Sequence, residues 1–200
     1  MDTQEIRTLK LLEELEGEKT PSQRDLAIRL NISLGLVNSF MKRLAQKGYF
    51  KVTNIPKNRV RYILTPKGTA EKTRLTYEYI QMSFRYYKNA RLKLRTLFRQ
   101  FEEQKIDRIA FFGAGELTEI AYISLQETNI KLVAIADSDK IGDNLLGLRI
   151  LAPEELRSLN FQKVVVTETN ATGNAMNQLI EQGIRRSQVE FVYIYRTMVL

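Results

Sequence analysis

The sequence contains no cysteine and no histidine among its 200 residues. Without cysteine the chain has no disulfide, no thiolate nucleophile and no cysteine-based zinc site. Without histidine it lacks the commonest metal ligand and general base, so catalysis would depend on carboxylates, lysine and tyrosine. We therefore expect no catalytic residues, no metal site and no enzymatic activity.

Long apolar runs are also missing. No stretch approaches the roughly 18 apolar residues that a membrane-spanning helix needs, and residues 1–5 lack the charged-then-apolar pattern of a signal peptide. We expect a soluble, cytoplasmic protein without a membrane partner.

Positive charge is abundant, but only in the first half. Residues 1–105 hold 22 Lys and Arg against 11 Asp and Glu, a net charge of +11, whereas residues 106–200 hold 9 against 12, a net charge of −3. Lysine and arginine that meet phosphates release condensed counterions, so a concentrated basic excess favours a polyanionic partner. The charge pattern points to double-stranded DNA as the partner of the first half.

A long amphipathic helix is expected at residues 66–104, with Thr65 as its cap and Pro66 in its first turn. Apolar or small residues recur along it at spacings of three and four: Leu75, Tyr79, Met82, Tyr86, Ala90, Leu94, Leu97 and Phe101. About 38 residues would span roughly 55–60 Å. Part of the stripe must therefore pack outside its own domain, on a second copy in a homodimer or only on the two flanking domains.

Residues 1–65 have the pattern of a helix-turn-helix followed by a wing. Helices are expected at residues 3–16, 23–30 and 33–47, with Ser22 and Ser33 as caps. In the third helix, the outward-facing residues suited to the major groove are Ser33, Leu34, Asn38, Ser39, Lys42 and Arg43. A β-hairpin with its turn at residues 56–59 should bring Lys57, Arg59 and Arg61 to a phosphate or the minor groove.

The segments "PSQRDLAIRLNISLGLVNSFMKRLAQKGYFKV" and "ILTPKGTAEKTRLTYEYI" resemble the MarR-type winged-helix regulators found with exopolysaccharide biosynthesis loci. The resemblance covers about residues 1–100, and "NISLGLVN" and "LTPKG" are its most specific parts. It implies a bacterial, dimeric, DNA-binding regulator and a role in controlling surface polysaccharide genes.

The second half begins with a strand, a glycine turn and a helix. An apolar strand at residues 106–112 leads into Gly113, Gly115 and Glu116, where the turn and the helix N-terminus suit a phosphate. The next strand ends at Asp137, at a distance along the chain that suits a carboxylate on ribose hydroxyls. Thr118 stands where a third glycine or alanine is expected, so a pyrophosphate would sit differently.

Further strands are expected at residues 148–151, 163–167 and 189–195, with helices between them, which predicts a parallel sheet. Thr167 and Thr169 follow the fourth strand and lie at the carboxyl edge that lines such a crevice. The expected ligand-binding residues are Gly113, Gly115, Glu116, Leu117, Asp137, Thr167 and Thr169.

This half resembles the compact Rossmann domains of Rex-type redox regulators, CoA-binding proteins and sugar-nucleotide enzymes, which share the "GAG" turn, the strand-end Asp and a segment like "KIGDNLLGLRIL". The resemblance implies a nucleotide-containing ligand such as NAD(H) or a nucleotide sugar, and it identifies no single one.

The expected architecture is thus an α+β winged helix-turn-helix domain at residues 1–65, a linker and dimerisation helix at 66–104, and an α/β Rossmann-like parallel-sheet domain at 105–200. The leading interpretation is a ligand-responsive transcriptional regulator. A nucleotide-sugar-modifying enzyme with an accessory winged helix is the first alternative; against it, no tyrosine is followed four positions later by lysine, so the Tyr-Lys pair of short-chain dehydrogenases is missing. The other alternative is a regulator whose second domain binds no ligand and serves only for dimerisation or docking.

Overall fold

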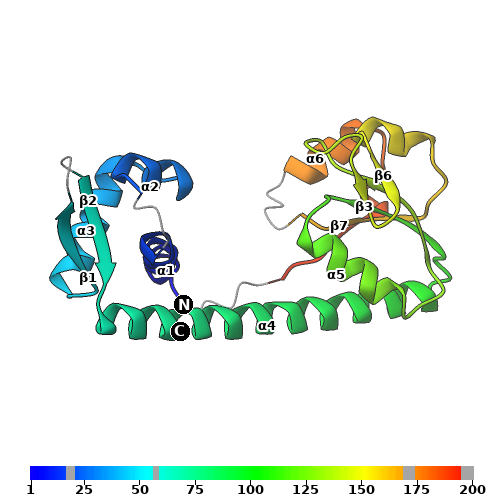
Figure 1. Cartoon of the computed structure of the whole chain (residues 1–200). Helices are drawn as coiled ribbons and strands as arrows, with labels where there is room; N and C mark the ends of the chain where they lie inside the picture. Colours follow the sequence, from blue (N-terminus) through cyan, green and yellow to red (C-terminus); the bar gives the residue numbers. More distant parts are fainter. Residues whose placement is uncertain (17–20, 56–58, 169–173, 195–200) are drawn as a thin grey trace. The chain divides into compact units, whose positions relative to one another are not determined.

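Figure 1 shows the computed structural model of the chain. It describes residues 1–16, 21–55, 59–168 and 174–194; the side chains of residues 54, 55 and 59 are also outside the description. The chain divides into two compact units, with the boundary between Phe84 and Arg85. This boundary falls inside the long helix α4, Pro66–Glu103. Each of the two units therefore contains one part of α4.

The first unit starts with three helices, α1 (Thr3–Glu16), α2 (Gln23–Arg29) and α3 (Leu34–Gln46). Both predicted caps are present. The Ser22 hydroxyl accepts a hydrogen bond from the amide of Asp25, and the Ser33 hydroxyl accepts one from the amide of Leu36. Because these side chains satisfy amides that a helix leaves unpaired, they fix where α2 and α3 begin.

An antiparallel hairpin of β1 (Phe50–Ile55) and β2 (Arg59–Leu64) follows α3. Phe50 lies opposite Leu64, and its ring meets Tyr62 edge to face with 5.5 Å between centroids. These side chains close the core of the unit, whose buried members are Leu11, Leu12, Leu15, Leu26, Val37, Phe40, Met41, Leu44, Tyr49 and Phe50. Three helices and a hairpin on one core confirm the predicted winged helix.

The "LTPKG" segment joins the hairpin to α4. The Thr65 hydroxyl accepts a hydrogen bond from the Gly68 amide at 3.1 Å and donates to the carbonyl oxygen of Gly48 at 2.6 Å. Gly68 packs so closely that a Cβ atom there would lie 1.8 Å from the carbonyl oxygen of Tyr49. Glycine is therefore required by close backbone packing, and the motif has a structural role.

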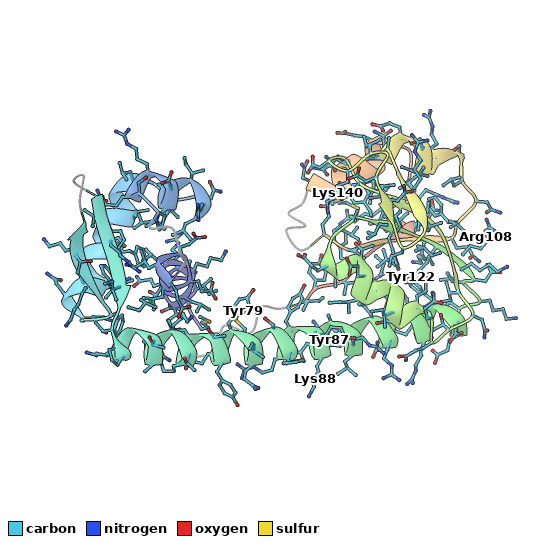
Figure 2. All side chains as sticks on the ribbon, in the orientation of Figure 1. Tyr79, Tyr87, Lys88, Arg108, Tyr122 and Lys140 are labelled. Carbon is cyan, nitrogen blue, oxygen red and sulfur yellow. The ribbon has the colours of Figure 1, made fainter. Side chains whose placement is uncertain are left out.

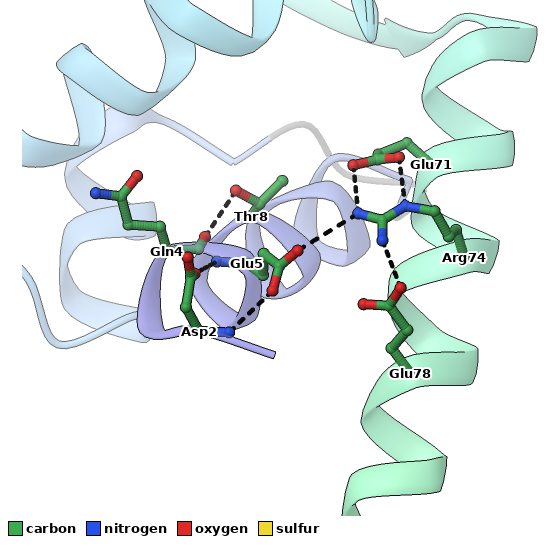
Figure 3. A network of polar contacts seen from close by, with 7 residues as sticks. All are labelled: Asp2, Gln4, Glu5, Thr8, Glu71, Arg74 and Glu78. Carbon is green, nitrogen blue, oxygen red and sulfur yellow. Dashed lines mark hydrogen bonds and ion pairs between the residues drawn. The ribbon is translucent and has the colours of Figure 1, made fainter. Parts of the chain in front are cut away.

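Charged side chains connect α1 to the first turns of α4. The Arg74 guanidinium is 2.9 Å from Glu71, 2.6 Å from Glu78 and 3.7 Å from Glu5 of α1 (Figure 3). The hydrogen bonds to Glu71 raise the pKa of Arg74, and the same contact lowers the pKa of Glu71. We call Glu5, Glu71, Arg74 and Glu78 the Arg74 cluster; its formal charge is negative.

The second unit contains a six-stranded sheet in the order β5-β6-β4-β3-β7-β8, within the described residues. All neighbouring strands are parallel except β5 and β6. The strands are β3 (Arg108–Phe112), β4 (Lys131–Ala136), β5 (Asn144–Leu145), β6 (Leu148–Leu151), β7 (Lys163–Val166) and β8 (Val189–Phe191). The unit is thus a mixed α/β domain with a mostly parallel sheet: the expected parallel strands are present, and the antiparallel strand β5 was not predicted. β8 is shorter than the expected strand at 189–195, whose last residue lies outside the described residues.

Helical segments cover both faces of this sheet: α5 (Glu116–Leu125), η1 (Pro153–Ser158), α6 (Asn174–Glu181) and η2 (Arg186–Gln188). Ile109 and Phe111 of β3 point to the face covered by α5 and the end of α4, whereas Ala110 and Phe112 point to the face covered by η1 and α6. This alternation follows from the two-residue period of a strand, and it buries both faces of β3.

The structure corrects the expected apolar stripe of α4. Ala90, Leu94 and Phe101 are buried in the second unit, and Phe98, which lay outside the predicted stripe, is fully buried with them. Leu97 is only partly buried, and Tyr79 is 44% exposed. The end of α4 is thus a helix of the sheet unit, and Leu94 is not available to a second copy.

Candidate functional site

One face of α3 is open to solvent. Gly35, Asn38, Ser39, Lys42 and Gln46 are exposed, and at about 100° per residue they lie on the side opposite Val37, Phe40 and Leu44. Ser33 and Leu34 are also exposed at the start of the helix, as predicted. Gly35 and Gln46 were missed by the sequence analysis, although the helical period places them beside Lys42.

Arg43 does not lie fully on this face. Its side chain is half-buried, with its guanidinium donating to the Gln4 amide oxygen at 2.9 Å and lying 4.4 Å from the centre of the Phe40 ring. These contacts tie α3 to α1. Arg43 thus lies at the edge of the exposed face, and a base contact would require it to leave both partners.

Arg61 is exposed on the hairpin, opposite Thr53 of β1. Lys51 is exposed on the same side of the hairpin, since residues two apart along a strand share a face. Lys57 lies outside the described residues, and so does the side chain of Arg59.

A crevice of about 400 Å³ opens in the second unit where β3, β4 and β7 end. Its lining residues are Ala114, Gly115, Glu116, Asp137, Ser138, Asp139, Lys140, Thr167 and Glu168. The sheet order reverses direction between β3 and β7, and ligands of parallel sheets bind at such a point. Gly115, Glu116, Asp137 and Thr167 were predicted here from the sequence. The lining residues that were not predicted are Ala114, between the two glycines of the turn, and Ser138, Asp139, Lys140 and Glu168, which directly follow Asp137 or Thr167.

The Asp137 carboxylate holds the glycine turn. One of its oxygens accepts from the Ala114 amide and the other from the Asp139 amide, both at 2.8 Å. Gly113 has φ of +109°, and a Cβ atom there would lie 2.9 Å from the amide nitrogen of Glu168. Asp137 is therefore already engaged with the protein, and a ligand hydroxyl would have to share its oxygens.

Thr118 fills the place where a third glycine was expected. Its fully buried hydroxyl donates to the carbonyl oxygen of Gly113 at 2.7 Å, accepts from the Gly115 amide at 3.2 Å and lies 2.9 Å from the Thr167 hydroxyl. The Ala114 and Gly115 amides are consequently occupied. The first amides of α5, those of Glu116 and Leu117, have no intrahelical acceptor and are the ones left for an anion.

Two predicted ligand residues differ in position from the others. The Leu117 side chain is 1% exposed and packs in the core, so only its backbone is near the crevice. Thr167 is also 1% exposed, and its hydroxyl bonds to the turn. Thr169 lies outside the described residues.

The lining of the crevice is acidic. Glu116, Asp137, Asp139 and Glu168 carry carboxyl groups, and Lys140 is the single cation among the lining residues; its ammonium donates to the Ala114 carbonyl oxygen at 2.6 Å. Partial burial, together with the charges of Asp137 and Asp139, raises the pKa of Glu168. A phosphate meets repulsion here except near the start of α5, whereas hydroxyl groups find several acceptors.

A second cavity of about 320 Å³ lies between α4 and the segment after β8, lined by Lys93, Leu97, Phe191, Val192 and Tyr193. It contains none of the predicted ligand residues. Within the part of the chain that the structure describes, no helix is long and apolar enough to cross a membrane, and no group of acidic side chains is arranged to hold a metal ion.

Comparisons with known protein families match two separate parts of the chain. Residues 4–51 match the family described as winged helix-turn-helix DNA-binding, and residues 105–190 match the family described as C2185-like, N-terminal. No curated protein matches the chain. The first match covers α1 to the start of β1, the elements that carry the exposed α3 face. The N-terminal unit is thus a winged helix-turn-helix DNA-binding domain, which indicates a DNA-binding regulator.

Proposed function

We propose that this chain is a transcriptional regulator of MarR-like type that binds duplex DNA as a homodimer. The observation that supports the proposal is the exposed face of α3 in the winged helix. The half of the chain that contains the winged helix also carries all of the excess positive charge. Asparagine, serine and lysine on that face are suited to base edges and phosphates. Lys51 and Arg61 on the hairpin supply further cations for the DNA backbone.

DNA binding is tested with the full chain and genomic fragments, by selecting the fragments that it retains and measuring their affinity at several salt concentrations. A steep fall of affinity with salt, together with preference for a few fragments, is the expected result. The resemblance to regulators of exopolysaccharide loci leads us to propose surface polysaccharide genes as the targets. Retention of fragments unrelated to such genes would remove that part alone.

We further propose that the second unit is Rossmann-like and senses a nucleotide-containing ligand in the crevice. Its parallel strands lie across the sheet in the order β6-β4-β3-β7-β8. If they are numbered 1 to 5 as they occur along the chain, this order is 3-2-1-4-5, which is the order of dinucleotide-binding sheets. The acidic lining favours ribose or sugar hydroxyls, for which Asp139 and Glu168 are acceptors, and a phosphate would lie at the Glu116 and Leu117 amides, away from most of these carboxylates. NAD(H) and nucleotide sugars both have these groups.

The ligand is tested by following the melting temperature of the second unit with NAD(H) and UDP-sugars. Gly115→Val is the informative variant, because a Cβ atom on Gly115 meets nothing within 4 Å and its φ of −117° suits any residue. The variant should fold and yet obstruct the crevice. Ile123→Ala, at an exposed position of α5 that does not line the crevice, is the control. A bound ligand should shift DNA affinity by about 1–3 kcal/mol.

The competing function is that the second unit only dimerises or docks and binds no ligand. One observation favours it: Asp137 and Thr118 already occupy two amides of the glycine turn. If neither NAD(H) nor a UDP-sugar raises the melting temperature, the docking function is the better account.

A further inference from the structure

A stripe of large apolar side chains on α4 is open to solvent. Tyr77 is 64% exposed, Ile80 43%, Phe84 59% and Tyr87 39%. Their spacings of three, four and three place them along one side of the helix. We call these residues the α4 stripe. It differs from the stripe predicted by the sequence analysis, which contained none of them.

Neighbouring apolar residues of α4 lie on other sides of the helix. Tyr79 is about 120° from the centre of the stripe at 100° per residue, and Lys88 borders the stripe. Figure 2 shows the side chains of Tyr79 and Lys88 on opposite sides of α4. The α4 stripe is therefore a narrow seam, like those that pair two helices.

The spacing of the stripe is the same in both directions. Residues 77 and 87 are equidistant from position 82, and so are residues 80 and 84. A two-fold interface requires a patch that complements itself, and a stripe with this symmetry meets that requirement when the two helices run antiparallel. We propose that two copies of the chain pair through the α4 stripe, with Tyr77 against the partner's Tyr87 and Ile80 against the partner's Phe84.

The amount of apolar surface suits such a pairing. Aromatic side chains bury about 150–250 Å² each, so the exposed fractions of the stripe amount to about 400 Å² per copy. That is about half of the ~800 Å² that each partner contributes to a standard interface. Residues bordering the stripe, including Thr76, Gln81, Ser83 and Lys88, would contribute the remainder. A patch of this size is comparable to the largest apolar patch on an ordinary monomer, which is often functional.

Charge also bears on the direction of the helices. In the antiparallel register pairs sum to 164, so Lys88 of one copy lies opposite residue 76 of the other, and the two copies of Lys88, which is exposed, stay apart. A parallel arrangement would instead place each Lys88 beside the partner's Lys88. The Arg74 cluster takes no part in the pairing, because Glu71 and Glu78 lie about 140–160° from the centre of the stripe at 100° per residue.

The antiparallel pairing also fits the proposed DNA binding, and this comparison rests on that proposed function. The winged helix contacts α4 between Gly68, which packs on Tyr49, and Leu75, which is fully buried. At 1.5 Å per residue, the two copies of Gly68 would lie about 42 Å apart along the helix axis and those of Leu75 about 21 Å apart. These values bracket the ~34 Å between successive major grooves on one side of DNA.

Light scattering of the full chain tests the pairing. Ile80→Glu and Phe84→Glu each place a charge in the seam and should weaken self-association at least about 100-fold. Tyr79→Glu and Leu92→Glu are matched controls, because both residues are exposed apolar positions of α4 away from the stripe. They should leave the dimer intact. Helical circular dichroism should remain unchanged in all four variants.

Cross-linking tests the direction of the helices without relying on charged variants. The chain has no cysteine, so single cysteines are introduced directly. Tyr77→Cys mixed with Tyr87→Cys should give the mixed disulfide, since pairing brings these positions together. Tyr77→Cys alone should not cross-link to itself.

Self-linked Tyr77→Cys would establish parallel helices and overturn the proposal. A parent protein that is monomeric at micromolar concentration, or a dimer that survives both Ile80→Glu and Phe84→Glu, would overturn it as well. Failure of DNA binding is a separate outcome: an intact dimer that binds no DNA fragment contradicts the proposed function and leaves the interface standing.

Discussion

The hydroxyl oxygens of Thr118 and Thr167 lie 2.9 Å apart in the buried centre of the second unit. Thr118 is in the first turn of α5 and Thr167 directly follows β7, so the bond joins the helix N-terminus to the neighbouring strand. Each hydroxyl oxygen also lies within hydrogen-bond distance of the carbonyl oxygen of Gly113, at 2.7 Å for Thr118 and 3.1 Å for Thr167. The glycine turn at the end of β3 is therefore held from two sides by threonine.

Thr118→Val should destabilise the second unit by about 1–3 kcal/mol, because it leaves the Gly115 amide and the Thr167 hydroxyl with fewer partners in a buried place. Chemical denaturation measures the change. Thr118→Ser keeps the hydroxyl and should lose less. Equal stability of the Val variant and the parent would show that the network does not stabilise the turn.

Gly68→Ala should destabilise the first unit by at least about 1–3 kcal/mol, because the new methyl group would overlap the Tyr49 carbonyl oxygen. Gly35→Ala is the matched control. A Cβ atom on Gly35 meets nothing within 4 Å, and alanine in a helix is favoured over glycine by about 0.5–1 kcal/mol. Thermal unfolding should shift in opposite directions for the two variants. A stable Gly68→Ala protein would contradict the close packing of the "LTPKG" segment.

Lys42→Ala should weaken DNA binding by about 1–3 kcal/mol if Lys42 contacts a base, or reduce the slope of log affinity against log salt by about 0.9 if it contacts a phosphate. Arg43→Ala should instead mainly affect stability, by about 0.5–1 kcal/mol, since Arg43 lies over the Phe40 ring. Fluorescence anisotropy and thermal unfolding separate the two effects. Lys131→Ala, at an exposed position of the second unit, is the charge control. Unchanged affinity and salt slope for Lys42→Ala would show that the α3 face is not the contact.

Glu168→Gln should raise the melting temperature at neutral pH. The pKa of Glu168 is raised in the folded protein by partial burial and by Asp137 and Asp139, so ionisation costs more in the folded than in the unfolded state. Below the ordinary pKa of a glutamate both states are protonated and the variant gains nothing. As the pH rises through the folded pKa, the parent loses stability relative to the variant.

Unfolding of both proteins between pH 3.5 and 8 checks this dependence. Glu119→Gln, at an exposed position of α5, should show no comparable pH-dependent gain. A gain of Glu168→Gln that is constant over this range would assign the effect to packing rather than to ionisation.

Local sequence signals predicted the elements well. The caps Ser22 and Ser33, the change of period at the hairpin and the Pro66 start of α4 depend on neighbouring residues in the chain, and all are present. The direction of the sheet also followed from alternating strands and helices. Each of these features depends on residues that are close together in the sequence, so a local pattern is enough to predict it.

The side chains of the crevice were predicted less completely. The spacing between Gly115 and Asp137 suggested a carboxylate directed at ribose, whereas the carboxylate binds the turn amides. Thr118 departs from the glycine pattern of such turns, and its hydroxyl is the centre of a buried network. Hydrogen-bond partners distant in sequence cannot be inferred from spacing.

The sequence by itself determined the winged helix, the long α4 and the parallel sheet, because charge, capping residues and hydrophobic period are local properties. Only the tertiary structure decided which apolar residues of α4 are used within the chain. Two stripes with similar spacing are available on one helix; packing against the sheet buries Leu94, Phe98 and Phe101, whereas Tyr77, Ile80, Phe84 and Tyr87 stay exposed. Periodicity gives the sides of a helix, and only the packing of distant segments determines which side is covered.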